Sequence, residues 1–502
     1  MTSPTDRSRL LVLANRLPVR RVRTGDRSEW ETSPGGLVAA LGPVLESHPG
    51  EATWIGWTGI TGEHHDPFRV DGVLLDPVEM SRGEVQLFYE GFCNSTLWPL
   101  YHDSIIRSEY HRTWWDAYVT INRRFTEHAA RRAEPDAVVW VHDYQLQMVP
   151  AMLRAVRPDV RIGLFLHIPF PPVELFLQLP WRRQLLHGLA GADVVGFQTR
   201  GGAANFRSLV ERLNIGEVDG ADVIVDGRRV QVGVFPIGVD AARIAQIAAD
   251  PATIDRAAEI RASLGDPETI LLGVDRLDYT KGIARRIEAF AELLSEERLE
   301  VPRHVLVQVA EPSREAVLGY SDIRDRVDGL VGEVNGAYGL VGAPAVTYLH
   351  RSQSTEELVA LYRAADVMLV TPVRDGMNLV CKEFVASRLD NTGVLVLSEF
   401  TGAAEALSDA LLVNPYDVDG LKNAIDRAAH LPTAEVTRRM AALRKSVTTD
   451  DVYAWARSAD LATVKMPKGC SSAVALWKWC TWEESWAATS KPFSASPVLA
   501  TW

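Results

Sequence analysis

Short apolar runs that recur along the whole chain constrain its fold more strongly than any other feature. Most of them do not alternate apolar and polar residues, which is typical of parallel strands buried on both faces of a sheet. We predict strands at 10–16, 138–143, 161–169, 193–199 and 232–238, and a second series at 270–277, 304–310, 346–350, 366–372, 393–399 and 411–415.

Helical segments lie between the apolar runs, and residues 352–366 show the pattern best. Ser354 and Glu357 have the S-x-x-E spacing of a capping box, in which side-chain oxygens satisfy the free N–H groups at a helix start. Leu358 and Leu361 then fall on one face of the helix. Alternation of strands and helices on this scale predicts an α/β fold.

The two series of runs are separated near FPIGVD, residues 235–240. We predict two Rossmann-like, doubly wound domains of about 200 residues each, with a ligand cleft between them at the carboxyl ends of the strands. The predicted boundaries are 1–240 for the first domain, 241–455 for the second and 456–502 for a C-terminal segment.

Composition limits which partners and cellular locations we expect for this protein. The net charge of −12 argues against a non-specific nucleic-acid binder, although a local Arg/Lys cluster is enough to bind phosphate. Four cysteines without a C-x-x-C pair favour a reducing, cytoplasmic location. No apolar run reaches the roughly 20 residues of a membrane span, and the polar start MTSPTDRSR does not resemble a signal peptide.

The end of the chain breaks the α/β pattern. From Leu461 onward it carries five of the 14 tryptophans and two of the four cysteines, with little periodicity. Two interpretations stay open for this tail, a wrongly framed or artificial segment and a functional appendage.

Polar residues cluster where the first predicted strands end. Arg16 follows strand 10–16 in ANRLPVR and could meet an anion. Gly35 and Gly36 open an apparent helix, whose N–H groups could approach a phosphate. The alternative for the glycine pair is a plain turn.

Two histidines end hydrophobic strands in the same half of the chain. They are His142, followed by Asp143 in WVHDYQ, and His167 in LFLHIPFPP. The prolines after His167 would stiffen its loop, as suits a positioned catalytic group. The alternative is that both histidines are structural caps.

The segment GVDRLDYTKGI places Arg276 and Lys281 after a strand and before a helix. Two cations at the carboxyl end of a strand suit a diphosphate, because Arg offers a planar fork and Lys a point charge. The alternative is a solvated pair. Neither a Walker pattern nor G-x-G-x-x-G occurs, so P-loop hydrolysis and ordinary dinucleotide binding are not supported.

The densest cluster is RDGMNLVCKE, residues 374–383, directly after strand 366–372. We expect backbone N–H groups near Asn378 and Leu379 to point into the cleft. In that arrangement Asp375 can accept hydrogen bonds from sugar hydroxyls, and Glu383 suits a ribose diol. The alternative is an ion-pair and capping cluster, and no role is assigned to Arg374 or Lys382.

Together these segments resemble the trehalose-6-phosphate synthase family, retaining glycosyltransferases with two Rossmann-like domains (GT-B type). The resemblance covers residues from about 9 to 457, and its specificity lies in the ordered set of motifs rather than in any one of them. The motifs are NRLPV, SPGGL, WIGWTG, NSTLWPLYH, HDYQL, LHIPFPP, GFQT, FPIGVD, DRLDYTKG, NGAYG, TPVRDGMNLVCKE and LVNPYD.

The resemblance implies roles by position for both substrates. Glucose 6-phosphate, the acceptor, would lie on the first domain and a nucleoside-diphosphate glucose, the donor, on the second. The implied acceptor residues are Arg16, Tyr89, Trp98, Asp143 and Arg314. The implied donor residues are Gly36, Arg276, Lys281, Asp375, Asn378, Leu379 and Glu383; His167 would lie near the reacting carbon and, with Asp375, Arg276 and Lys281, act in catalysis.

The resemblance also implies the reaction, transfer of glucose to the anomeric hydroxyl of glucose 6-phosphate to give α,α-trehalose 6-phosphate. UDP-glucose is the expected donor, with ADP- or GDP-glucose as alternatives. No Asp-x-Asp triplet or His-rich ligand set occurs, so we expect no metal or other cofactor. A homo-oligomer, dimer or tetramer, is expected, with small molecules as its substrates and no membrane or nucleic acid as a partner.

Three other functions are less compatible with the residues present. A related glycosyltransferase with another phosphorylated acceptor would keep the donor motifs but change the acceptor residues, of which Arg16, Trp98 and Asp143 are present. A non-catalytic sugar-phosphate sensor should have lost charge at the donor cluster, which is intact. A nicotinamide dehydrogenase lacks support because the dinucleotide fingerprint is absent.

Overall fold

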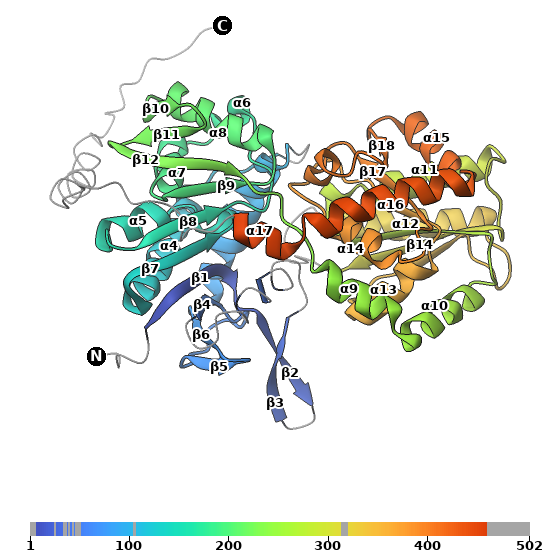
Figure 1. The fold of residues 1–502 in the computed structure, drawn as a ribbon, viewed down its shortest axis with the longest axis horizontal. Coiled ribbons are helices and arrows are strands. Elements are labelled where there is room, and N and C mark those ends of the chain that lie inside the picture. Colours follow the sequence, from blue (N-terminus) through green and yellow to red (C-terminus); the bar gives the residue numbers. More distant parts are fainter. Residues whose placement is uncertain are drawn as a thin grey trace, which may run out of the picture.

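The computed structural model describes residues 7–24, 27–33, 38, 41–42, 45, 52–103, 107–312 and 320–458. It has two α/β lobes side by side, each built on its own sheet (Figure 1). The predicted α/β class and the predicted two doubly wound domains are confirmed, and every predicted strand is present. Gly36, Arg314 and the tail from Leu461 lie outside the described residues.

The first sheet has ten strands in the order β10-β11-β12-β9-β8-β7-β1-β4-β6-β5. Its seven central strands, from β12 to β6, are parallel, and antiparallel strands flank them. The chain order reverses between β1 and β7, which makes that position the topological switch point. Their bounds are β1 (Ser8–Arg16), β4 (Ala52–Trp57), β5 (Phe68–Val70), β6 (Val73–Pro77), β7 (Ala133–His142), β8 (Arg161–Phe165), β9 (Val194–Phe197), β10 (Gly216–Asp219), β11 (Asp222–Val225) and β12 (Arg228–Val234).

The second sheet has six strands in the order β15-β14-β13-β16-β17-β18, all parallel. This is a Rossmann order, and its switch point lies between β13 and β16. The bounds are β13 (Thr269–Arg276), β14 (His304–Glu311), β15 (Val346–Leu349), β16 (Val367–Val370), β17 (Val394–Ser398) and β18 (Leu411–Val413). A separate hairpin, β2 (Val19–Thr24) with β3 (Arg27–Thr32), extends from the first domain.

Helices cover both sheets and connect their strands (Figure 1). In the first domain they are α2 (Arg82–Glu84), η2 (Val85–Leu97), α3 (Trp98–Tyr101), α4 (Arg112–Arg132), η3 (Tyr144–Leu146), α5 (Val149–Val156), α6 (Val173–Phe176), α7 (Arg182–Ala190) and α8 (Arg200–Arg212). The remaining helices are α9 (Ala241–Ala249), α10 (Pro251–Ser263), η4 (Tyr279–Lys281), α11 (Ile283–Ser295), α12 (Tyr320–Tyr338), α13 (Thr355–Ala364), α14 (Leu379–Ser387), η5 (Gly402–Glu405), α15 (Val418–Ala429), α16 (Thr433–Thr449) and α17 (Val452–Ser458).

The predicted capping box at α13 is half formed. The Ser354 hydroxyl accepts a hydrogen bond from the Glu357 N–H at 3.2 Å, as predicted. The Glu357 carboxylate, however, accepts hydrogen bonds from the guanidinium of Arg256 on α10, at 2.8 and 2.9 Å. An ion pair between neighbouring helices has therefore replaced the local contact that the spacing suggested.

Within the described residues the chain passes between the lobes twice, and the two crossings lie side by side. The first crossing is residues 235–240, and the second leads from α16 into α17, where the Val452 N–H donates to the Val239 carbonyl at 3.1 Å. Trp455 of α17 then stacks on Trp140 of the first sheet, with ring centroids 5.0 Å apart. The end of the described chain therefore returns to the first domain (Figure 1).

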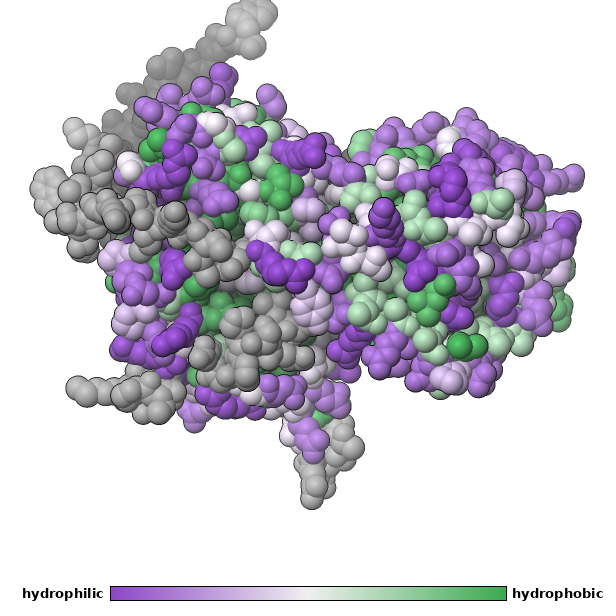
Figure 2. Space-filling view, viewed as in Figure 1, coloured by the Kyte–Doolittle hydropathy of each residue, from purple (hydrophilic) through white to green (hydrophobic). Residues whose placement is uncertain are grey.

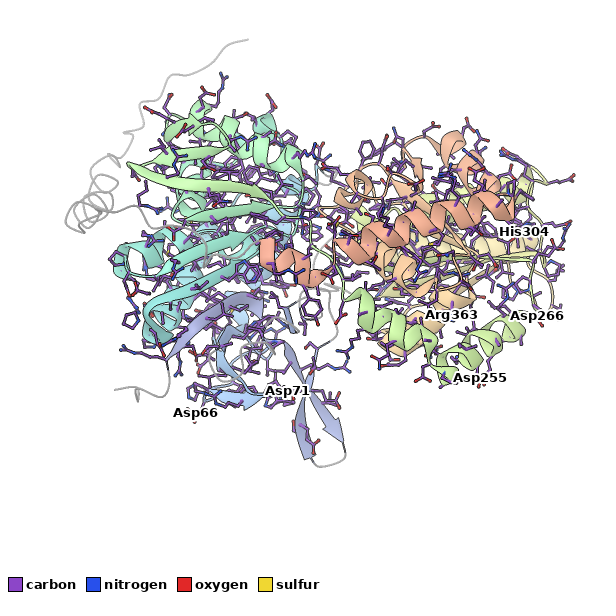
Figure 3. The ribbon with its side chains drawn as sticks, in the orientation of Figure 1. Asp66, Asp71, Asp255, Asp266, His304 and Arg363 are labelled. Carbon is purple, nitrogen blue, oxygen red and sulfur yellow. The ribbon has the colours of Figure 1, made fainter. Side chains whose placement is uncertain are left out.

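The outer surfaces are largely polar. The face in Figure 2 is mostly hydrophilic, with small scattered apolar patches. Charged side chains such as Asp71 and Asp255 lie at the outer edges of the two lobes (Figure 3). Within the described part of the chain, no helix combines the length and apolar character needed to cross a membrane.

Candidate active site

The polar residues predicted at the ends of strands lie at the boundary between the two lobes. Arg16 ends β1 and His142 ends β7, at the first switch point, while Arg276 ends β13 at the second. The two edges touch: a Cβ atom on Gly376 would lie only 2.7 Å from the carbonyl carbon of Ile168 in the first domain. The domains therefore meet at the carboxyl ends of their strands, where the ligand cleft is predicted.

The predicted donor residues Lys281 and Asp375 form an ion pair. Lys281 Nζ lies 2.6 Å from Asp375 Oδ2, and the two side chains are 12% and 13% exposed. Asn378 donates to the same carboxylate oxygen at 3.3 Å. Lys281, Asp375 and Asn378 thus form one polar cluster, called the donor wall below, although Lys281 and Asp375 are 94 positions apart in the sequence. The loop after Lys281 is closely packed, because Gly282 has φ 68° and a Cβ there would overlap the Thr371 carbonyl.

Helix α14 presents its N-terminus at this wall. The side chain of Asn378 caps the helix by accepting from the Cys381 N–H at 2.9 Å, and Leu379 is the first helical residue. The N-terminus of a helix attracts anions because its N–H groups and dipole are positive. One turn later, Glu383 accepts from the Tyr362 hydroxyl at 3.0 Å, and burial raises the pKa of the Glu383 carboxyl.

A buried ion pair that we did not predict lies beneath the donor wall. Arg286 Nη1 donates to Asp275 at 2.7 Å and to Gln308 at 2.8 Å, while its Nε donates to Thr371 at 3.2 Å. Asp275 and Arg286 are 2% and 0% exposed. The network ties β13, β14 and the residue after β16 together, which holds the strand ends that carry Arg276 and Asp375 in register.

On the acceptor side, Arg16 lies against an aromatic pair. The Arg16 guanidinium lies over the Trp57 ring at 4.7 Å, a cation–π distance. Gly59, with φ 90°, allows this approach, because a Cβ there would overlap the guanidinium. Tyr89, on the π-helical segment η2, lies edge-on to Trp57 at 6.4 Å. Trp57 was not predicted, although it ends WIGW in a motif of the family.

His142, Asp143 and His167 form one cluster, as their neighbouring strands suggested. His142 Nδ1 lies 3.1 Å from His167 Nε2, and the Asp143 carboxylate accepts from the His167 N–H at 3.1 Å. Asp143 has φ 72°, a strained conformation that turns its side chain back toward β8. Burial lowers the pKa of His167 to about 3 and that of His142 well below its usual value, so both rings are neutral near pH 7.

Contacts across the cleft join the two halves of the site. The Arg276 guanidinium lies 5.5 Å from the centroid of the Trp98 ring in the first domain. The ring of His102 also contacts Trp98, with centroids 4.0 Å apart and the planes tilted by 33°. Burial lowers the pKa of His102 to about 4, although the carboxylates of Asp278 and Asp375 oppose the shift. His102 was missed, and its one signal was its place at the end of NSTLWPLYH.

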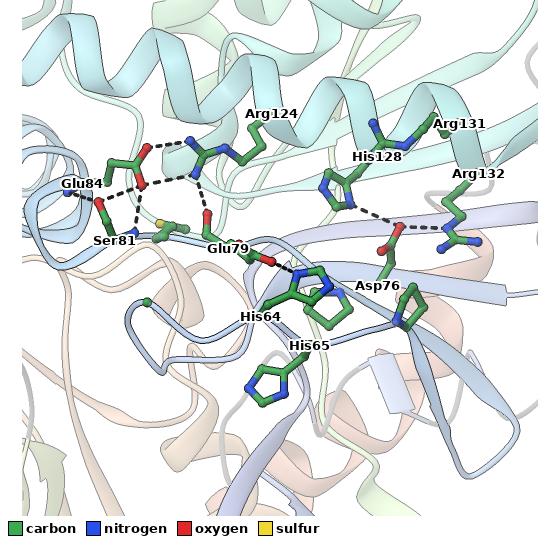
Figure 4. Close-up of a pocket in the computed structure, with 14 residues that line it drawn as sticks. His64, His65, Asp76, Glu79, Ser81, Glu84, Arg124, His128, Arg131 and Arg132 are labelled. Atoms are coloured by element: carbon green, nitrogen blue, oxygen red, sulfur yellow. Dashed lines mark hydrogen bonds and ion pairs between the residues drawn. The ribbon is translucent and has the colours of Figure 1, made fainter. Parts of the chain in front are cut away.

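A separate hollow of about 660 Å³ lies beside α4, away from these residues (Figure 4). Arg132 pairs there with Asp76 at 2.9 Å, and Arg124 pairs with Glu84 at 2.6 Å. Because these charges are already neutralised and no predicted site residue lines the hollow, the cleft remains the candidate site. Among the residues that the structure describes, no group of three or more His, Cys, Asp or Glu side chains is arranged to hold a metal ion.

Two Rossmann-like domains whose switch points meet across a cleft define a glycosyltransferase fold of the GT-B type. The sequence profile of glycosyltransferase family 20 matches residues 8–462, and the chain belongs to this family. The resemblance inferred from the motifs is thereby confirmed.

Named relatives agree with this assignment. The trehalose-6-phosphate synthase of Mycolicibacterium gilvum (strain PYR-GCK) is 53% identical over 471 residues, which cover 91% of this chain and 93% of that protein. A solved UDP-forming α,α-trehalose-phosphate synthase from Burkholderia xenovorans, in complex with glucose-6-phosphate, has 32% identity, a TM-score of 0.83 and coverage of 90% and 98%. A structure named "Trehalose-6-phosphate from E. coli bound with UDP-2-fluoro glucose" has 33% identity, a TM-score of 0.83 and coverage of 91% and 100%.

Proposed function

We propose that this protein is a retaining glucosyltransferase that transfers glucose from UDP-glucose to glucose 6-phosphate, forming α,α-trehalose 6-phosphate and UDP. The observation that carries the proposal is the Lys281–Asp375 pair at the N-terminus of α14, beside Gly376, which lies against the backbone of Ile168 in the first domain. Its relatives include one solved structure named as bound with UDP-2-fluoro glucose and another in complex with glucose-6-phosphate, which supports these two classes of substrate.

On the donor side, Arg276, Lys281 and the α14 N–H groups from Leu379 onward bind the diphosphate. Two cations and a helix dipole are suited to the charge of that group. Glu383 binds the ribose diol, and Asp375 binds hydroxyls of the transferred glucose. Gly36, outside the described residues, completes this set in the proposal.

On the acceptor side, Arg16 binds the phosphate of glucose 6-phosphate. Tyr89 and Trp98 line the sugar, and Asp143 accepts its hydroxyls. Arg314, which also lies outside the described residues, supplies a second phosphate contact from the other domain. The buried ring of Trp98 is 4% exposed and lies against Arg276, so it brings the acceptor next to the leaving diphosphate.

Transfer proceeds with the acceptor attacking on the face from which the diphosphate departs, through an oxocarbenium-like state. The leaving diphosphate helps to deprotonate the acceptor, and Arg276 and Lys281 stabilise its growing charge. His167, neutral near pH 7, offers a hydrogen bond near the reacting carbon without adding positive charge beside the developing cation. The two cations supply the charge stabilisation, so we propose that no metal is required.

The test combines a donor panel with an acceptor panel. Purified protein is assayed with UDP-, ADP- and GDP-glucose and glucose 6-phosphate, following nucleotide release and identifying the disaccharide phosphate by NMR. An α,α-linked product supports the proposal, and a β-linked product or the absence of transfer contradicts it. Arg16→Ala should raise KM for glucose 6-phosphate by at least 10-fold while leaving activity with unphosphorylated glucose little changed; equal losses with both acceptors would refute the Arg16 assignment.

We also propose a cytoplasmic location and a homo-oligomeric state. Cys93 and Cys381 are both buried free thiols, which suits a reducing compartment. The oligomer rests on the family resemblance alone, and a mass measurement of the protein in solution tests it.

A further inference from the structure

Lys382 is a buried cation without an assigned role, next to the proposed ribose ligand. Its side chain is on the first turns of α14 and only 3% exposed. Its Nζ donates to the Ile237 carbonyl at 2.6 Å, and within the described residues it forms no ion pair. Burial lowers the pKa of Lys382. A buried ammonium held by one carbonyl is costly, so this contact calls for an explanation beyond stability.

Its partner, Ile237, lies in the first crossing between the domains. The Ile237 N–H donates to the side-chain oxygen of Gln198, which follows β9 in the first domain and is 4% exposed, at a distance of 3.0 Å. One residue of the linker is therefore held from both sides, by Gln198 of the first domain and Lys382 of the second.

The second crossing is packed against the two residues that follow Ile237. A Cβ on Gly238 would overlap the backbone of Asp450 and Asp451, so the two crossings are in close contact. The Val239 carbonyl accepts from the Val452 N–H at 3.1 Å, and Asp450 raises the pKa of Lys382, against the larger effect of burial. Within the described residues, the two connections between the domains therefore meet at Gly238 and Val239, directly after Ile237, so we take this stretch as the pivot.

The same helix holds the donor. Asn378 caps α14, and Glu383, the residue after Lys382, turns away from the linker to Tyr362. Motion of α14 about Ile237 would therefore carry the diphosphate and ribose contacts together, relative to the acceptor on the first domain.

We propose that Lys382 and Gln198 are positioning residues: through the Ile237 peptide they fix the angle at which the donor helix faces the acceptor domain. This inference rests on the proposed function for its kinetic consequence. Displacement of about 1 Å between reacting groups can cost about 10²-fold in rate. A loosened pivot would also admit water to the donor, which raises hydrolysis relative to transfer.

The test is Lys382→Met, which keeps the length of the side chain and removes its charge and hydrogen bond. We expect the UDP Kd to stay within about 3-fold of the unsubstituted protein, because no proposed donor contact is lost. Transfer kcat should fall 10- to 100-fold, in line with the cost of misplacement. The ratio of free glucose released to trehalose 6-phosphate formed should rise at least 5-fold.

Lys422→Met is the matched control. Lys422 is a second buried lysine of the same domain, 5% exposed, but it pairs with Glu292 at 2.9 Å and Glu296 at 2.6 Å, away from the linker. We expect this variant to lose stability with an unchanged ratio of hydrolysis to transfer. An unchanged ratio in Lys382→Met, or an equal rise in both variants, overturns the proposal.

Two further measurements test the proposal if Lys382→Met does not fold or if the protein transfers no glucose. If Lys382→Met does not fold, Gln198→Leu tests the same peptide from the other domain, and an unchanged ratio there overturns the proposal. Small-angle scattering with and without UDP separates this inference from the proposed function. A protein that transfers no glucose refutes the function, whereas scattering profiles that are the same for Lys382→Met and the unsubstituted protein, both with and without UDP, refute the pivot.

Discussion

Replacing Lys281 by Met separates the catalytic role of this lysine from its role in the fold. In the structure Lys281 pairs with Asp375 at 2.6 Å, and Asn378 contacts the same carboxylate at 3.3 Å. The substitution removes a charge that would stabilise the leaving diphosphate. It also leaves the Asp375 carboxylate, whose side chain is 13% exposed, with the hydrogen bond from Asn378 but without its cation.

The substitution should affect stability and turnover by amounts that can be estimated separately. At 2.6 Å and an effective dielectric constant of about 20, the Coulomb attraction of the pair is about 6 kcal/mol, much of which is offset by desolvation. Removing one partner of a buried pair costs about 3–5 kcal/mol, and we expect the lower end because both side chains retain some exposure. For a domain of this size that lowers Tm by roughly 6–12 °C. Loss of one preorganised charge lowers kcat by about 10²–10³-fold.

The assay follows UDP release at saturating substrates and thermal unfolding, for Lys281→Met, Asp375→Asn and the double variant. In the double variant no charge is left unpaired, so Tm should recover by several degrees relative to Lys281→Met while activity stays low. Near-normal turnover by Lys281→Met would refute the diphosphate assignment. A double variant no more stable than Lys281→Met would refute the energetic argument.

Two further predictions concern the cleft and its histidines. Gly376→Ala should lower kcat/KM at least 10-fold, because a Cβ there would lie only 2.7 Å from the backbone of the first domain. Gly336→Ala is the control, because the space around Gly336 is open and kcat/KM should not change. Equal kinetics in the two variants would contradict the close contact. His142 is fully buried and its folded pKa lies well below the unfolded value of about 6.5, so stability is lost as pH falls below 6.5. Between pH 7 and pH 5, protonation of this histidine in the unfolded state should lower the free energy of unfolding, measured in urea, by about 2 kcal/mol. His142→Gln should reduce the pH dependence of that free energy by the same amount, and an unchanged pH dependence would contradict the prediction.

The sequence was most informative where parallel strands end. Runs such as 270–277 were recognisable because strands buried on both faces need continuous apolar residues. The polar residues after them, Arg276 and Asp375, could be grouped because the carboxyl ends of parallel strands share one edge. The β2–β3 hairpin escaped prediction, since VRRVRT and RSEWET are largely polar and make no apolar run.

Residue-level contacts between distant segments were beyond sequence reasoning. The π-helical turn that carries Tyr89 has no simple periodicity signature. Arg286 reads as an ordinary helix residue in IARRIEAF, yet it is fully buried beneath the donor wall. Glu357 matched a capping motif, but its carboxylate bonds to Arg256 of another helix. In each case a partner supplied by tertiary packing decided the outcome.

Sequence patterns were sufficient to predict the class of fold, the two domains and the sheet edge at which the polar residues gather. These follow from hydrophobic periodicity and from the topology of parallel sheets, which local patterns encode. Only the tertiary structure decided that Lys281 pairs with Asp375 and that Lys382 reaches Ile237, 145 positions away. Such contacts depend on the relative placement of two domains, and no local pattern of residues carries that information.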